Sequence, residues 1–408
     1  MAYPLEGVKV LDFTRVLAGP FASRILSDLG ADVVKIEPPD GDITRVFGRK
    51  INEISGYYTQ QNVGKRAICV DLTKPGATEL LLRMAAEADV VLENFRPGVM
   101  SSFGLGWEDL SAVNPRLVML SISGFGQDGP ERDRASYAPI IHGEVGLLQR
   151  QQFVDGADQP RDFALSIADT FSGLHGVVGL LAALSYVQRT AIGQHVDMAM
   201  INAMFFTDDY AHYELENARI VNGGGQVFDA PGGPLMLAGD EKWYWRVLNT
   251  KAGLQDPTPE GADLGTKIKL RRQAIQDYLL SFTDRDVLLA KLTEVNLAWG
   301  NVHDHRSVFE HQGSIEGRAV LTDVDDRAGG RRRITNTPYR FSAAEAGARR
   351  PAAYLGEHNY EAFLDWLGSS EADVDEWHRA GILVQDDNAA RASQHRSPST
   401  LVAPDQTG

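Results

Sequence analysis

Short apolar segments alternate with helical patterns through the N-terminal part of the chain, and this alternation constrains the fold more than any other sequence feature. Continuous apolar strands separated by helices are typical of an α/β fold with a parallel sheet covered on both faces. Such connections are right-handed and place binding loops at the carboxyl ends of the strands. The spacing predicts strands over residues 8–13, 32–37, 66–70, 90–92 and 117–122, with helices over 21–29 and 75–88 between them.

The rest of the chain divides by composition. At 408 residues it is too long for one core of ordinary size, and a glycine- and proline-rich stretch follows a change in composition near residue 217. We expect a large domain over residues 1–215, a smaller domain over 220–330, a return to the large domain over 335–387 and a disordered tail over 388–408. The patterns also predict helices over 172–189, 270–281, 284–294, 360–367 and 373–380, a strand over 243–247 and an extended segment over 335–341.

Charge and cysteine content disfavour several classes of protein. The net charge of −15 argues against a nucleic-acid partner or an anionic membrane. The single cysteine, Cys69, lies in an apolar run and fits a reducing compartment. The N-terminus shows no signal-peptide pattern, and the most apolar stretch, residues 176–184, is shorter than the ~20 residues that span a bilayer. We therefore expect a cytoplasmic protein without a membrane partner.

Common ligand-binding motifs are missing from the sequence. The α/β pattern first suggests a dinucleotide-binding enzyme, but the turn over residues 14–20 lacks the G-x-G-x-x-G pattern. Neither a P-loop nor a G-x-S-x-G elbow is present. The sequence also has no Cys/His cluster and no H-E-x-x-H motif, so we expect no metal and no bound cofactor.

Asp169 stands just before the predicted helix over residues 172–189. A carboxylate in this place caps a helix and lies at the positive end of the helix dipole. From position alone, a cap without chemistry is the simpler interpretation of Asp169, and a reactive carboxylate is the alternative.

An ordered set of motifs runs through the first half of the chain and returns near its C-terminus. Its members are Pro4-Leu5-Glu6-Gly7, Val10-Leu11-Asp12-Phe13, Leu29-Gly30-Ala31-Asp32-Val33-Val34-Lys35-Ile36-Glu37, Asn62-Val63-Gly64-Lys65-Arg66, Glu93-Asn94-Phe95-Arg96-Pro97-Gly98, Ala168-Asp169-Thr170, Gly193-Gln194-His195-Val196-Asp197 and Leu355-Gly356-Glu357-His358. This set resembles the family III CoA-transferases, which include formyl-CoA transferase and carnitine CoA-transferase. The alpha-methylacyl-CoA racemases are related to them.

The resemblance implies both a fold and a mechanism. The fold is α/β, with a Rossmann-like large domain built from both termini, a smaller inserted α+β domain, and two chains interlocked as a homodimer. Asp169 is the catalytic nucleophile, kept ionised by the helix N-terminus, and it transfers coenzyme A from an acyl-CoA to a carboxylic acid through an aspartyl anhydride and thioester. A glycine-rich loop of the small domain covers the site in this family, and it corresponds here to Gly223, Gly224, Gly225 and Gln226.

The same resemblance suggests residues that contact CoA. Basic side chains pair with the phosphates of the nucleotide, and an aromatic side chain offers an apolar face to adenine. The implied contacts are Val16, Lys65, Arg66, Leu72, Lys74, Asn94, Phe95 and Tyr137, with Arg45 and Arg96 as additions.

Two positions near the acyl group depart from formyl-CoA transferase. Leu17 stands where that enzyme has glutamine, and Ala138 stands where it has glutamate. The loss of two polar groups argues against oxalate or formate and favours a larger or less polar acid. Arg15 and His142 are candidates to bind a second carboxylate of such a substrate.

Two other functions stay open at this point. A 2-methylacyl-CoA racemase or epimerase would move the alpha proton with a histidine and an aspartate. Tyr137 occupies the place of the racemase histidine, which disfavours this function, although His142 lies nearby. A non-catalytic CoA-binding paralogue is the third possibility, and the presence of Asp169 with the glycine-rich loop argues against it.

Overall fold

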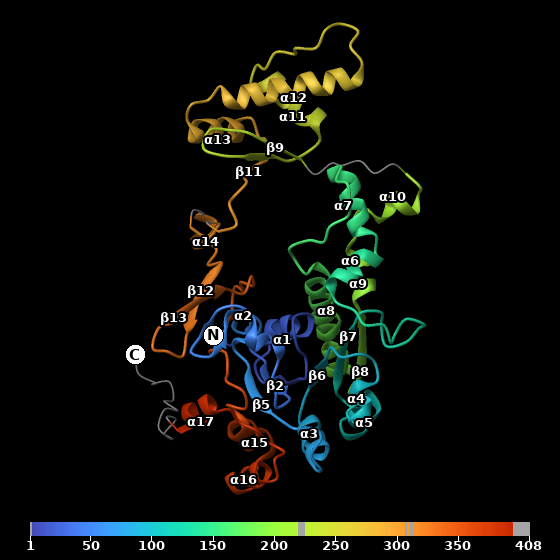
Figure 1. Cartoon of the computed structure of the whole chain (residues 1–408), viewed down its shortest axis with the longest axis vertical. Helices are drawn as coiled ribbons and strands as arrows, with labels where there is room; N and C mark the ends of the chain where they lie inside the picture. Colours follow the sequence, from blue (N-terminus) through green and yellow to red (C-terminus); the bar gives the residue numbers. More distant parts are fainter. Residues whose placement is uncertain (1, 219–224, 307, 311–312, 395–408) are drawn as a thin grey trace. The chain divides into compact units, whose positions relative to one another are not determined.

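The computed structural model describes residues 2–218, 225–306, 308–310 and 313–394 (Figure 1). The chain divides into two compact units: unit 1 comprises Met1–Asp209 and Arg318–Gly408, and unit 2 comprises Tyr210–Gly317. The boundaries of unit 2 thus fall before the expected domain limits at residues 220 and 330. Each unit has its own hydrophobic core.

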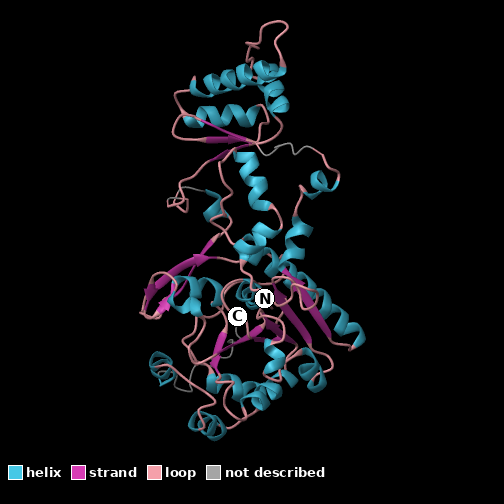
Figure 2. Cartoon of the chain, turned by 45° about the vertical axis from the view of Figure 1, so that its right-hand side comes forward, coloured by secondary structure: helices cyan, strands magenta, loops and turns pink. Residues whose placement is uncertain are grey.

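Unit 1 is built on a six-stranded parallel sheet, visible among the magenta strands of Figure 2. Its strands are β1 (Lys9–Asp12), β2 (Asp32–Glu37), β5 (Arg66–Cys69), β6 (Val90–Glu93), β7 (Val118–Ser123) and β8 (Gln194–Ala199). They lie in the order β5-β2-β1-β6-β7-β8, and every neighbouring pair is parallel. The predicted parallel sheet is therefore confirmed. Its strand order is that of a Rossmann fold, which reverses between β1 and β6.

Helices cover both faces of this sheet because its strands are apolar on both sides. One face carries α1 (Ala18–Asp28), α6 (Ala138–Glu144), α8 (Ile167–Thr190) and α9 (Met200–Thr207), packed on a core that includes Val33, Val90 and Leu120. The other face carries α3 (Ala77–Ala86), α5 (Trp107–Val113), α15 (Asn359–Leu367) and α16 (Glu371–Arg379). Since α15 and α16 come from the C-terminal segment, both ends of the chain contribute to unit 1.

The α8 helix is the one helix of the described residues that is long and apolar enough to cross a membrane, with 24 residues and a mean hydropathy of 1.5. The core helices of many proteins meet the same criteria. In this structure α8 packs along β7 and β8 and against α1, with Val177, Leu180 and Val187 buried. It is therefore a covering helix of the sheet.

Shorter elements complete unit 1. They are η1 (Ile43–Val46), β3 (Lys50–Ile51), β4 (Ile54–Ser55), α2 (Gly56–Asn62), α4 (Val99–Ser102), α7 (Leu147–Asp155), β12 (Leu321–Asp325), β13 (Arg331–Thr335) and α17 (Asp387–Gln394). The strands β12 and β13 form an antiparallel pair. Of the extended segment expected over residues 335–341, only Thr335 lies in a strand, as the last residue of β13. The α17 helix occupies the start of the segment expected to be disordered from residue 388, and the rest of that segment, from residue 395, lies outside the described residues.

Unit 2 combines a three-stranded antiparallel sheet with helices. Its elements are α10 (Ala211–Leu215), β9 (Gln226–Phe228), β10 (Leu235–Leu237), α11 (Glu241–Lys251), α12 (Leu264–Leu280), α13 (Arg285–Glu294), β11 (Trp299–Asn301) and α14 (Gly313–Gly317). The strand order is β11-β10-β9, and Leu237, Leu248 and Leu292 are among its fully buried core residues.

The predicted strand over residues 243–247 is wrong, because this segment lies within helix α11. The Asp240 side chain accepts a hydrogen bond from the amide of Lys242 and caps the helix. Tyr244, Val247 and Leu248 are buried at helical spacing. The short aromatic segment over residues 243–247 suggested a strand, whereas the whole segment over Glu241–Lys251 shows the helical period.

Candidate active site

A cavity of about 150 Å³ opens where the strand order of the sheet reverses. Its walls come from the turns after β1, β6 and β7 and from the first turn of α8, so unit 1 alone builds it. Ligands of open α/β sheets bind at this kind of switch point, outside the carboxyl ends of the strands. The cavity is therefore the leading candidate for a binding site in unit 1.

Asp169 lines this cavity from the first turn of α8. The helix begins at Ile167, five residues before the expected start, so Asp169 is its third residue and Ser166 is the N-cap. Burial raises the pKa of Asp169 to about 6, while a hydrogen bond from the amide of Ala18 acts in the opposite direction. Burial thus outweighs this hydrogen bond, but a carboxyl with a pKa of about 6 is still mostly ionised near pH 7.

A close approach of two helices brings the Ala18 amide to Asp169. Ala18 is the first residue of α1, whose N-cap, Leu17, makes no side-chain capping bond. The approach depends on Gly173, because a Cβ atom there would lie 2.7 Å from the carbonyl oxygen of Ala18. The carboxyl of Asp169 therefore lies at the N-termini of both α1 and α8, where amide groups favour negative charge.

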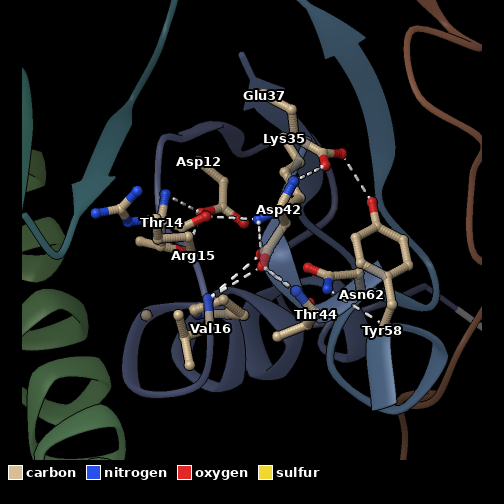
Figure 3. A network of polar contacts seen from close by, with 12 residues as sticks. Asp12, Thr14, Arg15, Val16, Lys35, Glu37, Asp42, Thr44, Tyr58 and Asn62 are labelled. Carbon is tan, nitrogen blue, oxygen red and sulfur yellow. Dashed lines mark hydrogen bonds and ion pairs between the residues drawn. The ribbon is translucent and has the colours of Figure 1, made fainter. Parts of the chain in front are cut away.

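The turn after β1 is held by buried polar groups, as Figure 3 shows. The amide of Thr14 donates to Asp12 at 2.9 Å, and Lys35 donates to the carbonyl of Thr14 at 2.5 Å. The amide of Val16 donates to the Asp42 carboxylate at 3.3 Å. Val16 has a φ of 69°, which β-branched residues rarely adopt. These contacts maintain a strained turn at the wall of the cavity.

Asn94 joins the turn after β6 to the turn after β1. Its Oδ1 accepts from the amide of Arg15 and its Nδ2 donates to the carbonyl of Arg15, both at 2.9 Å. The Arg15 guanidinium lies over the Phe95 ring, 5.3 Å from its centroid. The side-chain amide of Asn94, which was expected to contact CoA, is thus occupied by the backbone of Arg15.

Lys65 and Arg66, which were expected to pair with CoA phosphates, lie buried away from the cavity lining. Lys65 is 3.1 Å from the carboxylate of Asp12, and burial lowers its pKa to about 8. Arg66 pairs with Asp32 and, at 2.8 Å, with Asp365. Both cations therefore already have carboxylate partners, which the sequence could not show because those partners are distant in the chain.

The remaining expected CoA contacts are divided between the cavity and its surroundings. Val16, Phe95, Arg96 and Tyr137 line the cavity. Leu72 packs against the core beside the sheet, and the exposed Lys74 lies 3.9 Å from Asp71, both just after β5. Arg45 is partly buried and does not line the cavity, and its guanidinium pairs with the Glu37 carboxylate at 2.6 Å.

The four expected acyl-pocket residues also differ in position. Arg15 lines the cavity, whereas Leu17, Ala138 and His142 are buried and do not line it. His142 cannot bind a second carboxylate, because its ring nitrogens are hydrogen-bonded to Asp162 and to the amide of Ala168.

The glycine-rich loop is described only in part. Gly223 and Gly224 lie outside the described residues. Gly225 has a φ of 115° and Gln226 begins β9, and both belong to unit 2.

Sequence reasoning missed two features of the site. Arg132 and Arg134 line the cavity from the loop after β7. Glu93 ends β6 and accepts the amide of Phe95 at 2.7 Å, and burial raises the pKa of this carboxyl to about 7. A carboxylate at the end of an apolar strand was the available signal for Glu93. Within the described residues, no group of three or more His, Cys, Asp or Glu side chains is placed to hold a metal ion.

Comparison with known proteins gives a consistent set of matches. The family model described as CoA-transferase family III matches residues 5–359. The succinate–glutarate CoA-transferase of Agrobacterium fabrum is 32% identical, over 89% of this chain and 95% of that protein. The formyl-CoA:oxalate CoA-transferase of Streptomyces avermitilis is 31% identical, over 92% of this chain and 98% of that protein.

Solved structures agree with the sequence matches. A CaiB/BaiF family protein from Brucella suis superposes with a TM-score of 0.75 at 30% identity, over 90% of this chain and all of that chain (100%). Rv3272 from Mycobacterium tuberculosis gives a TM-score of 0.74 at 27% identity, over 88% of this chain and 98% of that chain.

Proposed function

The chain belongs to CoA-transferase family III, and from this premise we propose that it moves coenzyme A from an acyl-CoA to a carboxylic acid through a covalent intermediate on Asp169. One observation carries the proposal: Asp169 is the one carboxylate among the described residues that line the cavity at the switch point. Its position at two helix N-termini fits a nucleophile that passes through oxyanionic intermediates.

The proposed reaction conserves the activated acyl group at each step. The ionised carboxylate of Asp169 attacks the thioester carbonyl and expels CoA thiolate, which leaves a mixed anhydride. The thiolate then attacks the aspartyl carbonyl, so that the donor acid leaves and an aspartyl-CoA thioester forms. The acceptor carboxylate attacks this thioester, and the released thiolate attacks the acyl carbonyl of the new anhydride, which gives the product acyl-CoA and regenerates Asp169. No ATP or metal enters this sequence.

We further propose that the substrates include a dicarboxylic acid. Four arginines, Arg15, Arg96, Arg132 and Arg134, line the cavity. Arg134 already pairs with Glu131 and Glu144, so Arg15, Arg96 and Arg132 are the candidates to supply positive charge for carboxylates and for the phosphates of CoA. The names of several relatives pair CoA with succinate, glutarate or oxalate. The apolar Leu17 and Ala138 beside the cavity favour an acid larger than oxalate.

We also propose that the enzyme is a cytoplasmic homodimer, with the two chains interlocked as the family resemblance implies. Exposed apolar side chains on α8 and α9 support a partner surface: Val178 is 60% exposed and Phe206 is 82% exposed. The free and buried Cys69 fits a reducing compartment.

A 2-methylacyl-CoA racemase fits the site less well. The two-base mechanism needs a histidine opposite the aspartate. Tyr137 lines the cavity in that place, and both ring nitrogens of His142 have partners.

Mass analysis of thioesters tests the proposed activity. The wild-type enzyme, incubated with a panel of acyl-CoAs and free acids, should produce exchanged thioesters. Asp169→Ala should bind CoA but lose exchange by roughly 10⁴-fold or more, because the covalent pathway is removed. Asp375→Ala, on the exposed side of α16, is the matched control and should keep full activity. Normal exchange by folded Asp169→Ala protein would contradict the proposal.

A further inference from the structure

His142 is fully buried in α6 and makes two directed contacts. Its Nδ1 lies 2.7 Å from the carboxylate of Asp162, in the loop that leads into α8. Its Nε2 lies 3.1 Å from the backbone nitrogen of Ala168, the second residue of α8. Phe163 packs edge-on against the ring, with the centroids 6.0 Å apart. His142 thus joins α6 to the start of α8.

These contacts select one form of the imidazole. The amide of Ala168 is a donor, so Nε2 must accept and carries no proton. The proton of the neutral ring then resides on Nδ1, which donates to Asp162. Asp162 therefore selects the tautomer that accepts the Ala168 amide. A ring with a proton on Nε2 would place two N–H groups against each other.

The start of α8 depends on this contact because the helix has no conventional cap. The N-cap residue, Ser166, makes no side-chain capping bond. The amides of a first helical turn have no acceptor within the helix. His142 supplies the acceptor for Ala168, and Asp169 is the next residue. The imidazole thus occupies the role of a capping side chain, from a different helix.

We propose that His142, held in one tautomer by Asp162, is a positioning residue that fixes the first turn of α8 and thereby aims the carboxylate of Asp169 into the cavity. This inference rests on the proposed function for its effect on turnover, and on the hydrogen bonds alone for its effect on the helix. His142 does not touch the cavity, so it moves no proton of the substrate.

Two substitutions at His142 separate positioning from other roles. His142→Phe keeps a planar ring but removes the acceptor, whereas His142→Gln can accept the Ala168 amide through its carbonyl oxygen and donate to Asp162. We expect His142→Phe to lower kcat by about 100-fold, with KM for acyl-CoA little changed, because a displaced nucleophile acts on chemistry more than on binding. His142→Gln should restore kcat to within about fivefold of the wild type.

Hydrogen exchange supplies a readout that does not require activity. The amide of Ala168 should exchange roughly five- to tenfold faster in His142→Phe and at the wild-type rate in His142→Gln. Asp162→Ala should also weaken the contact between His142 and Ala168, but less than His142→Phe does, and it should lower kcat by about tenfold. His378→Phe, on α16, is the control for loss of a half-buried histidine and should change neither kcat nor this exchange rate.

Each outcome decides the proposal. A folded His142→Phe protein with wild-type kcat would overturn it, and so would a His142→Gln protein as impaired as His142→Phe, since that result would require the imidazole itself. If His142→Phe does not fold, unchanged kcat and unchanged Ala168 exchange in Asp162→Ala overturn it. A wild-type enzyme that transfers no CoA would refute the proposed function, while the exchange pattern at Ala168 would still test the positioning contact.

Discussion

At the scale of single residues, the sequence predicts Asp169 as the reactive carboxylate but does not describe its surroundings. The motif around Asp169 carried the resemblance to CoA-transferases, whereas its pKa of about 6 results from burial against α1 and α6. Lys65 and Arg66 show the same limit. The sequence shows that both residues are basic, but it does not show that Lys65 pairs with Asp12 and Arg66 with Asp365. A sequence therefore shows which motif an ionisable residue belongs to, but it does not show whether that residue is paired with another charge in the folded protein.

Glu93 gives a pH-dependent stability that can be measured. Burial raises the pKa of this carboxyl to about 7 in the folded protein, above the ordinary glutamate value of 4.5. Between these two pH values the folded state binds the extra proton, so stability falls as pH rises from about 4.5 to about 7. The difference between the two pKa values lowers the free energy of unfolding by roughly 3 kcal/mol above pH 7. Glu93→Gln, which mimics the protonated form, should remove this loss.

Thermal or urea unfolding of the two proteins across this pH range tests the role of Glu93. The stability of Glu93→Gln relative to the wild type should increase by roughly 3 kcal/mol between pH 4.5 and pH 8. Parallel stability curves for the two proteins would show that Glu93 does not hold a raised pKa.

At the scale of elements, strands of the sheet were easier to predict than helix limits. The runs that became β1 and β2 are apolar throughout and bounded by turn residues, so the pattern has one interpretation. The start of α8 was placed too late because Asp169 suits a helix cap by sequence, whereas the true first turn is stabilised by His142 and α1, which are contacts from outside the helix. In α11, the three consecutive aromatic residues Trp243, Tyr244 and Trp245 hid the helical period.

Gly173 connects the packing of α8 to the chemistry. Gly173→Ala would place a Cβ 2.7 Å from the backbone of Ala18, so α1 and α8 must move apart. We expect kcat to fall by about 100-fold, because the Asp169 carboxylate loses its place beside the Ala18 amide. Overpacking of this kind also costs about 1–3 kcal/mol of stability.

A second glycine of α8 is the control in the same steady-state assay. Gly179→Ala would meet only the Val196 side chain, at 3.1 Å, on the face toward the sheet. It should keep kcat near the wild-type value. Equal loss in both variants would mean that helix packing in general, and not the approach to Ala18, limits turnover.

At the scale of the whole molecule, the large unit and its parallel sheet were predictable because motif order and strand pattern agree. The smaller unit was harder, since its short strands and its limits follow from tertiary contacts that weak local patterns do not show. The exposure of apolar side chains on α8 and α9 could not be predicted either, because the sequence pattern suggests that Val178 and Phe206 belong to the core.

Light scattering tests the proposed assembly. We expect a particle of about twice the chain mass of 44.7 kDa that persists on dilution, since interlocked chains cannot separate while folded. Val178→Glu places a charge on the proposed contact and should reduce the yield of this dimer. A folded wild-type monomer in dilute solution would contradict the interlocked homodimer.

The covalent role of Asp169 is the central claim, and trapping the intermediate tests it most directly. The enzyme is incubated with acyl-CoA and hydroxylamine in heavy water, and both the peptides and the acyl-CoA are analysed by mass. An anhydride or thioester on Asp169 reacts with hydroxylamine, so the account predicts a hydroxamate confined to the peptide that contains Asp169. An unmodified peptide together with deuterium at the alpha carbon of the acyl group would contradict the account and identify a racemase.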